Sequence, residues 1–220
     1  MDDIFEPEQN DDPTFVEVTL ADAIAQMKKA WTNERIARKL LPHRFDLVDS
    51  LLGEVERTQA ELEETTDKTR VQYGAKRTDV DRVSYVINSY IRTRMRKIEA
   101  NAAALLMEHT ERQAQQKDDL MDEREVVFAE NYHKDRVLLF NSTLFNELSE
   151  NLRPLPIAKL PSGGRCFVRV AKERDLRGVA VFDMNDPNSD VLVDLQAGST
   201  HLIPFNSIQS HLEADNVELL

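Results

Sequence analysis

The chain has 220 residues and a net charge of −12, with 41% hydrophobic residues, 31% charged residues and a single cysteine, Cys166. This length suits one large domain, or a medium domain with a small one, and the composition is typical of a soluble globular protein. One cysteine excludes an intramolecular disulfide. The overall acidity disfavours independent, tight binding to duplex DNA, because the phosphates repel the chain.

The acidic charge is concentrated at the N-terminus, where residues 1–19 contain seven acids and no base. The opening sequence is acidic where a signal peptide is basic and then apolar, and no apolar run approaches the roughly 20 residues that span a bilayer. We therefore expect an intracellular protein without a membrane segment, in which residues 1–18 form a disordered acidic tail. A short patch in this tail is either a partner-docking motif or a solvated terminus; it consists of Asp2, Asp3, Ile4 and Phe5.

Helical periodicity begins directly after this tail. Thr19, followed three residues later by Asp22, is typical of a helix N-cap with an acid in the first turn. Ala23, Met27 and Trp31 then recur at helical spacing. The sequence therefore predicts a first helix that starts at residue 20.

Two more helical regions follow along the chain. An apolar stripe from Phe45 to Leu62 lies opposite a charged face, which predicts a long helix that is partly exposed to solvent. The polar segment 65–76 contains Gly74, so we predict a loop there. The region 118–148 has apolar residues on more than one face, which is typical of a helix buried on several sides. The helices together carry more apolar surface than they can bury among themselves.

The basic stretch Arg82–Ala100, RVSYVINSYIRTRMRKIEA, contrasts with the acidity of the whole chain. At 100° per residue its apolar side chains fill one arc, and Arg94 falls inside that arc. Because an unpaired guanidinium there is costly, Arg94 should bind a carboxylate or several carbonyls, in this chain or across an interface. Arg92 and Arg96 lie on the far side as an exposed strip. They form a solvated face, contact an acidic protein neighbour, or bind nucleic-acid phosphate.

The composition of the sequence changes after residue 150. NLRPLPIAKLPSGGR contains three prolines and a Gly-Gly pair, which indicates a linker. The short runs CFVRV, GVAVF, VLVDL and THLIPF predict strands, FNSIQSHLEA a short helix, and VELL a last strand. We predict a mainly α fold with a small β-rich C-terminal domain. Its parts are a helical bundle domain at 19–150, a linker at 151–163 and the β-rich domain at 164–220.

Patterns that indicate catalysis are absent from the sequence. The five histidines are scattered, and with one cysteine no Cys/His spacing fits zinc. A calcium loop is a poor match for DMNDPNSD at 183–190, which lacks the glycine and the final glutamate and fits a hairpin loop better. A P-loop is excluded for PSGGR at 161–165, which lacks the lysine. We predict no catalytic residue, no metal and no cofactor. Trp31, Tyr85 and Tyr90 are either packing residues or platforms for base stacking.

Three stretches can be compared with a known family: AWTNERIARKLL (30–41), DRVSYVINSYIRTRMRKIEA (81–100) and VLVDLQAGSTHLIPFNSIQSHL (191–212). They resemble the Sld-five subunit family of the GINS complex. The resemblance extends over nearly the whole chain after residue 15 and includes the order of the domains. Its most specific piece is Ser-Tyr-Ile-Arg-x-Arg at 89–94.

The resemblance implies a non-enzymatic nuclear subunit in a 1:1:1:1 complex with three other GINS subunits. That complex joins an MCM ring and a phosphoesterase-like partner to form the replicative DNA helicase. A replisome adaptor and polymerases are further candidate partners, and the acidic tail is similar to an adaptor-binding motif. DNA contact is at most indirect. The resemblance assigns six residues to the intersubunit core, its support or the closed C-terminal strand: Trp31, Tyr90, Arg94, Met95, Leu219 and Leu220.

An alternative comes from the charge of one helix alone. The segment Arg82–Lys97 would then act as a stand-alone module that binds single-stranded nucleic acid. That module would bind DNA as a lone chain, with an affinity that falls as salt rises. A structural subunit would instead need its partners in order to stay soluble.

Overall fold

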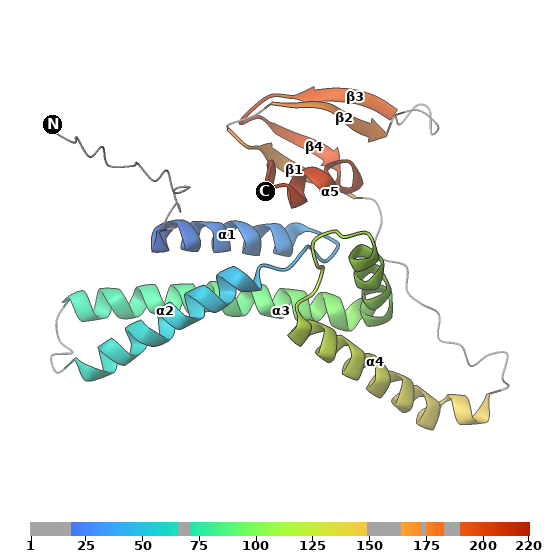
Figure 1. Ribbon diagram of the computed structural model, residues 1–220, viewed down its shortest axis with the longest axis horizontal. Coiled ribbons are helices and arrows are strands. Elements are labelled where there is room, and N and C mark those ends of the chain that lie inside the picture. Colours follow the sequence, from blue (N-terminus) through green and yellow to red (C-terminus); the bar gives the residue numbers. More distant parts are fainter. Residues whose placement is uncertain (1–18, 66–70, 149–163, 173–174, 183–189) are drawn as a thin grey trace, which may run out of the picture.

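A computed structural model of the chain describes residues 19–65, 71–148, 164–172, 175–182 and 190–220 (Figure 1). The predicted acidic tail with its Asp2–Phe5 motif, the predicted linker and most of the predicted hairpin loop lie outside these ranges. Within them, no helix has the length and the apolar character required to cross a membrane.

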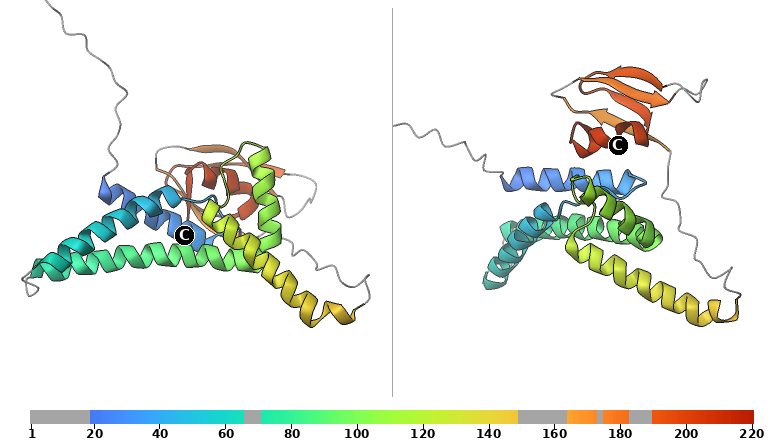
Figure 2. Two further views of the ribbon diagram at one scale, coloured as in Figure 1. Left: turned by 60° about the horizontal axis from the view of Figure 1, so that its bottom comes forward. Right: turned by 45° about the vertical axis from the view of Figure 1, so that its right-hand side comes forward.

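The N-terminal region is a bundle of helices joined by short segments, as the periodicity predicts. The first helix begins after Thr19, whose side chain accepts a hydrogen bond from the backbone N–H of Asp22 at 3.2 Å. Figures 1 and 2 show α1 lying between the other long helices and the C-terminal sheet. The helices are α1 (Leu20–Ile36), α2 (Phe45–Glu64), α3 (Val71–Ala114) and α4 (Glu123–Thr143), followed by the short turn η1 (Phe145–Glu147).

The loop predicted at 65–76 is wrong in its second part, because α3 already begins at Val71. Gly74 lies in this first section of the helix, where a Cβ would meet nothing within 4 Å. A glycine in an exposed helix costs only about 1 kcal/mol, and this cost is offset because α3 packs Val80 against Val55 and Leu62 of α2. The helix bends at Asn101, whose φ of −140° and ψ of 34° are not helical.

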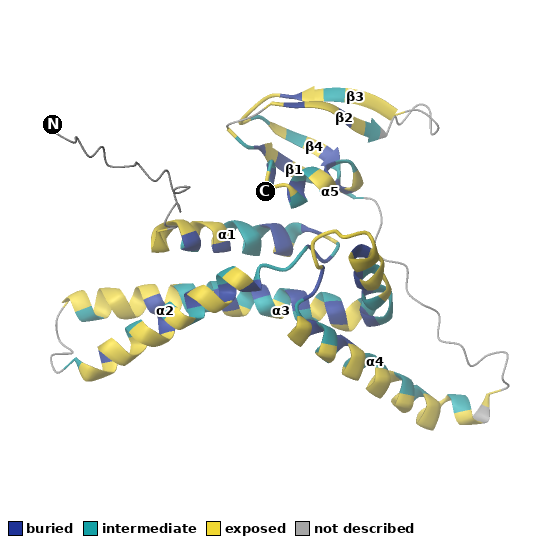
Figure 3. Cartoon of the chain, in the orientation of Figure 1, coloured by how far each residue is buried: buried dark blue, intermediate teal, exposed yellow. Residues whose placement is uncertain are grey.

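The predicted helix at 118–148 also needs correction. It begins at Glu123, because Asp122 caps it in a capping box with Glu125. The expectation of burial on several sides is wrong within this chain, since the buried residues of α4 are Glu125 and Ala129. Figure 3 shows that the far end of α4 is largely exposed, away from the other helices.

The C-terminal region contains the strands and the short helix that the sequence predicts. Strands β4, β1 and β5 form one antiparallel sheet, and β2 pairs with β3 in an antiparallel ribbon. The predicted last strand pairs with the strand that opens this region, with Leu219 opposite Val168. The elements are β1 (Arg165–Val170), β2 (Leu176–Phe182), β3 (Asp190–Leu195), β4 (Thr200–Pro204), α5 (Phe205–Glu213) and β5 (Val217–Leu219).

The core of the C-terminal region includes residues from the helical region. Ala37 and Leu41, which follow α1, belong to the same apolar cluster as Val168, Ile208 and Leu219. The two regions therefore share a core along the end of α1.

We expect Leu219→Ala to destabilise the C-terminal region by about 2–5 kcal/mol, since a fully buried leucine would leave a cavity. Thermal denaturation of the chain in its purified assembly measures this loss. The matched control is Leu220→Ala, because Leu220 is the next residue and is 41% exposed. Equal, small effects of both changes would show that β5 does not close this core.

Candidate subunit interface

A buried ion-pair cluster centres on Arg94, whose side chain has no exposed surface. Its Nε and Nη2 atoms donate to the two carboxylate oxygens of Glu125 at 2.7 and 2.8 Å, a bidentate pair. Its Nη1 donates to Glu34 at 3.1 Å and to the carbonyl of Leu41 at 2.7 Å, and Nη2 also donates to the carbonyl of Leu120 at 2.9 Å. The predicted pairing of Arg94 is confirmed, and it occurs within this chain.

Two neighbours complete the cluster. Lys97 Nζ donates to the carboxylate of Glu34 at 2.5 Å, and the Tyr90 hydroxyl accepts from the backbone N–H of Arg44 at 3.2 Å. Burial raises the pKa of Tyr90 to about 12, and burial lowers the pKa of Lys97 against the attraction of Glu34. Burial alone would lower the pKa of Arg94, but the hydrogen bond with Glu125 together with the charges of Glu34 and Glu125 outweighs it, so the pKa lies above its ordinary value. The cluster is a charge-paired anchor.

The cluster ties four segments of the helical region together. Glu34 comes from α1, Leu41 from the α1–α2 connection, Arg94 from α3 and Glu125 from the first turn of α4. Sequence reasoning missed both carboxylates, although each has a signal. Glu34 lies seven residues after Met27, on the apolar face of α1, and Glu125 completes an Asp-x-x-Glu capping box.

The helix that this cluster anchors exposes apolar side chains from its second turn to its C-cap. Val127, Leu138, Leu139 and Leu144 are between 53% and 59% exposed. The rings of Phe140 and Phe145 lie 6.0 Å apart near the end of α4. Several large apolar side chains that are exposed along one helix are candidates for contact with a protein partner. We define the α4 apolar surface as Val127, Leu138, Leu139 and Leu144.

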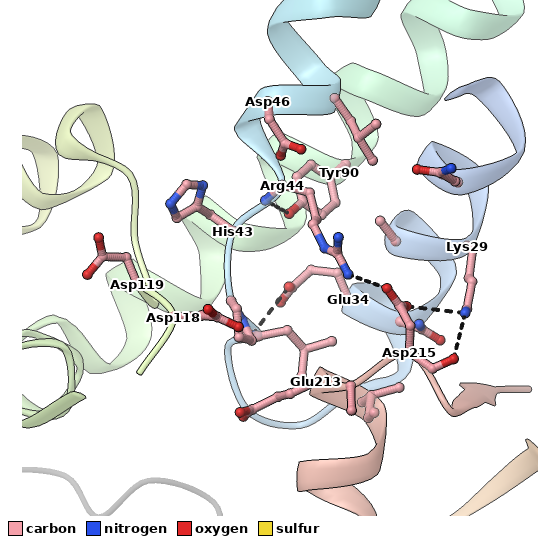
Figure 4. Close-up of a pocket in the computed structure, with 18 residues that line it drawn as sticks. Lys29, Glu34, His43, Arg44, Asp46, Tyr90, Asp118, Asp119, Glu213 and Asp215 are labelled. Atoms are coloured by element: carbon pink, nitrogen blue, oxygen red, sulfur yellow. Dashed lines mark hydrogen bonds and ion pairs between the residues drawn. The ribbon is translucent and has the colours of Figure 1, made fainter. Parts of the chain in front are cut away.

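A second candidate site is a pocket of about 820 Å³ between α1, α2 and the end of α5 (Figure 4). Lys29 and Arg44 both point to Asp215, with Nζ and Nη2 at 3.2 and 2.6 Å from its oxygens. Nearby, Arg112 pairs with both oxygens of Glu213 at 3.1 Å. These ion pairs join the helical and C-terminal regions.

One backbone contact supports the same junction. The N–H of Leu219 donates to Asn33 Oδ1 at 2.9 Å, so a strand of the C-terminal region binds a buried side chain of α1. Burial alone would raise the pKa of Asp215, but the hydrogen bond and charge of Arg44, helped by Lys29, hold it below its ordinary value of 3.8. The contribution of Asp215 to docking is therefore present above that value and is lost as the pH falls through the lower folded-state pKa.

We expect the double change Glu213→Gln and Asp215→Asn to loosen this junction without unfolding the C-terminal region. Partly exposed pairs contribute about 0–1 kcal/mol each, whereas the bond between Asn33 and Leu219 and the shared core remain. Hydrogen exchange should become faster in residues 205–220. The control Glu218→Gln changes an acid of β5 that has no ion pair in the described ranges. Unchanged exchange in the double variant would contradict a role for these pairs.

Two family models match the chain. One, described as the GINS complex protein helical bundle domain, matches residues 50–144. The other, described as the C-terminus of the DNA replication complex GINS protein SLD5, matches residues 166–220. Together the two matches cover more than half of the chain, in the order of the helical and β-rich regions.

The chain belongs to the SLD5 family of GINS complex proteins.

Curated relatives agree with this assignment over almost the full length. The chain is 28% identical to a protein of Rattus norvegicus, over 93% of this chain and 92% of the relative. It is 24% identical to one of Bos taurus, covering 99% and 98%, and 25% identical to one of Xenopus laevis, covering 100% and 99%. Each relative is named DNA replication complex GINS protein SLD5. The resemblance stated from the sequence is thus confirmed.

The SLD5-family chain places its predicted interface residues in different environments. Tyr90, Arg94 and Leu219 are buried inside the chain and show almost no surface. Leu220 is exposed, while Trp31 and Met95 are half-buried. The Trp31 ring packs edge-on against Tyr85 at 6.3 Å.

The two cations of the exposed strip lie where the helical spacing puts them, since Arg92 and Arg96 are both exposed on α3. The stand-alone nucleic-acid module loses one of its cations, however, because Lys97 is bound internally by Glu34. Phosphate binding along the whole segment from Arg82 would therefore depend on fewer charges than the sequence suggests.

Proposed function

We propose that the chain is a non-catalytic structural subunit of a GINS heterotetramer, in a 1:1:1:1 complex with three other GINS subunits. In the nucleus, this complex joins an MCM ring and a phosphoesterase-like partner to form the replicative DNA helicase. A replisome adaptor and polymerases are further partners, and DNA contact is at most indirect. The relatives' names, which place them in a DNA replication complex, support this role.

The α4 apolar surface is the observation that most supports a scaffold role. Its leucines and valine are more than half exposed, although α4 is anchored at its first turn by the buried Arg94–Glu125 pair. An anchored helix that presents apolar side chains is suited to obligate assembly, because burying the exposed half of each such side chain contributes about 1–2 kcal/mol.

The remaining candidate residues act in this proposal either at the interface or behind it. Trp31 and Met95, half-buried on α1 and α3, contribute to the intersubunit core or its support. Tyr90 and Arg94 act from inside by fixing α3 against its neighbours. Leu219 closes the C-terminal strand, and Leu220 continues it to the surface.

Co-expression with the three other GINS subunits tests this function. We expect native mass spectrometry to show one particle with one copy of each subunit, and we expect the chain expressed alone to aggregate. Light scattering of the lone chain at micromolar concentration is the critical control. A stable, monodisperse monomer that does not join the other subunits would contradict the proposal.

A further inference from the structure

A basic pocket of about 470 Å³ lies between the end of α1 and the middle of α3. It is distinct from the α4 apolar surface and from the pocket of Figure 4, with which it shares no lining residue. Its lining contains no carboxylate. The cations that line it are Arg35, Arg38, Lys39, Arg96 and Lys97.

The charges of this pocket are not all satisfied within the described part of the chain. Lys97 is bound to Glu34, and the Arg35 guanidinium lies 4.7 Å from the centre of the Trp31 ring, a contact that leaves its charge in place. Arg38 and Arg96 are exposed and have no ion pair among the described residues. The pocket therefore has an excess of positive charge on an acidic protein.

The same chain contains a segment of opposite charge. Residues 1–12 contain six acids and no base. They precede α1 at Leu20, and Arg35 lies 15 residues further on, about 22 Å along the helix at 1.5 Å per residue. About seven extended residues at roughly 3.3 Å each span that distance. Residues 13–19 are thus long enough to span the distance from the start of α1 to the pocket, so residues 1–12 can reach it.

We propose that the acidic segment of residues 1–12 binds the basic pocket of its own chain and covers it in the absence of a competing ligand. Tethering raises the effective concentration of this segment at the pocket to about the millimolar range, so weak carboxylate–guanidinium contacts suffice. The arginine forks match carboxylates in bidentate geometry.

The observations favour this occupant over a nucleic acid. A polynucleotide would be repelled by a chain of net charge −12. The compact pocket also suits a few carboxylates better than an extended strand, whose phosphates need a continuous positive groove. The experiment below separates these two ligands.

A fluorescent peptide with the sequence of residues 1–18 measures access to the pocket. It is titrated against the full chain, in the assembly in which it purifies, and against a variant with the acids of residues 1–12 neutralised. That variant carries D2N, D3N, E6Q, E8Q, D11N and D12N. Since it lacks the internal competitor, we expect it to bind the peptide at least tenfold more tightly than the unmodified chain.

Adding Arg38→Ala and Arg96→Ala to the neutralised variant should lower peptide affinity at least tenfold. The control combines Arg77→Ala with Arg82→Ala, which makes the same charge change on an exposed part of α3. We expect this control to lower the peptide affinity less than twofold. Equal peptide affinities for the unmodified and neutralised chains would overturn the proposal. It would also be overturned if fluorescent oligothymidylate, and not the peptide, bound in a manner that requires Arg38 and Arg96.

Discussion

Replacing Arg94 with alanine is expected to destabilise the helical region by about 3–5 kcal/mol. The change would leave Glu125, which is 0% exposed, as a buried carboxylate without its cation. Glu34, which is 1% exposed, would keep only Lys97. The carbonyls of Leu41 and Leu120 would lose their donors as well. Because the cluster joins α1, α3 and α4, the same change should also lower the yield of the assembled complex.

Arg92→Ala is the matched control, since Arg92 lies two residues away on the exposed side of α3. We expect it to cost about 0–1 kcal/mol. Arg94→Lys should also be strongly destabilising, because a lysine ammonium cannot reproduce the bidentate contact with Glu125 and the two carbonyl contacts together. Thermal denaturation of the purified assembly and its yield measure the three variants. Similar, small effects of Arg94→Ala and Arg92→Ala would contradict the role of the cluster.

The features of α3 that follow from local geometry are predictable from the sequence. A spacing of 100° per residue puts Arg94 among apolar side chains and Arg92 and Arg96 opposite them, and their burial and exposure agree. The cap at Thr19 and the strand near Leu219 are predictable for similar reasons, because each depends on neighbouring residues.

The partners of Arg94 depend on tertiary structure instead. Glu34 is 60 residues away and Glu125 is 31 residues away, so periodicity predicts that a partner is needed but not which one. Asp215 is a similar case, since its two cations, Lys29 and Arg44, are 186 and 171 residues away along the chain. The start of α3 at Val71 shows the opposite failure, because a polar segment with a glycine favours a loop until α2 packs beside it.

We expect Leu138→Asp with Leu139→Asp to abolish incorporation of the chain into the GINS complex. Both leucines belong to the α4 apolar surface and are already more than half exposed, so the change removes little from the chain's own core. Since little more than half of each leucine is exposed, its complete burial by a partner would contribute about 1–2 kcal/mol, and a buried carboxylate in its place would add a desolvation cost of several kcal/mol. Every 1.4 kcal/mol is a factor of ten in affinity, so the reduction in complex formation should exceed one hundredfold.

Val71→Asp is the control that separates an interface from general surface chemistry. Val71 is 88% exposed in the first turn of α3, where an acid also suits the helix dipole, so this change should leave assembly intact. Co-purification of tagged chains with the other GINS subunits measures both variants, and circular dichroism checks their helix content. Two outcomes would exclude α4 as the interface: assembly of the double variant at the level of the unmodified chain, or equal loss with Val71→Asp. Loss of assembly in the double variant alone would mean that another subunit covers, in the complex, the α4 apolar surface that is exposed in the lone chain.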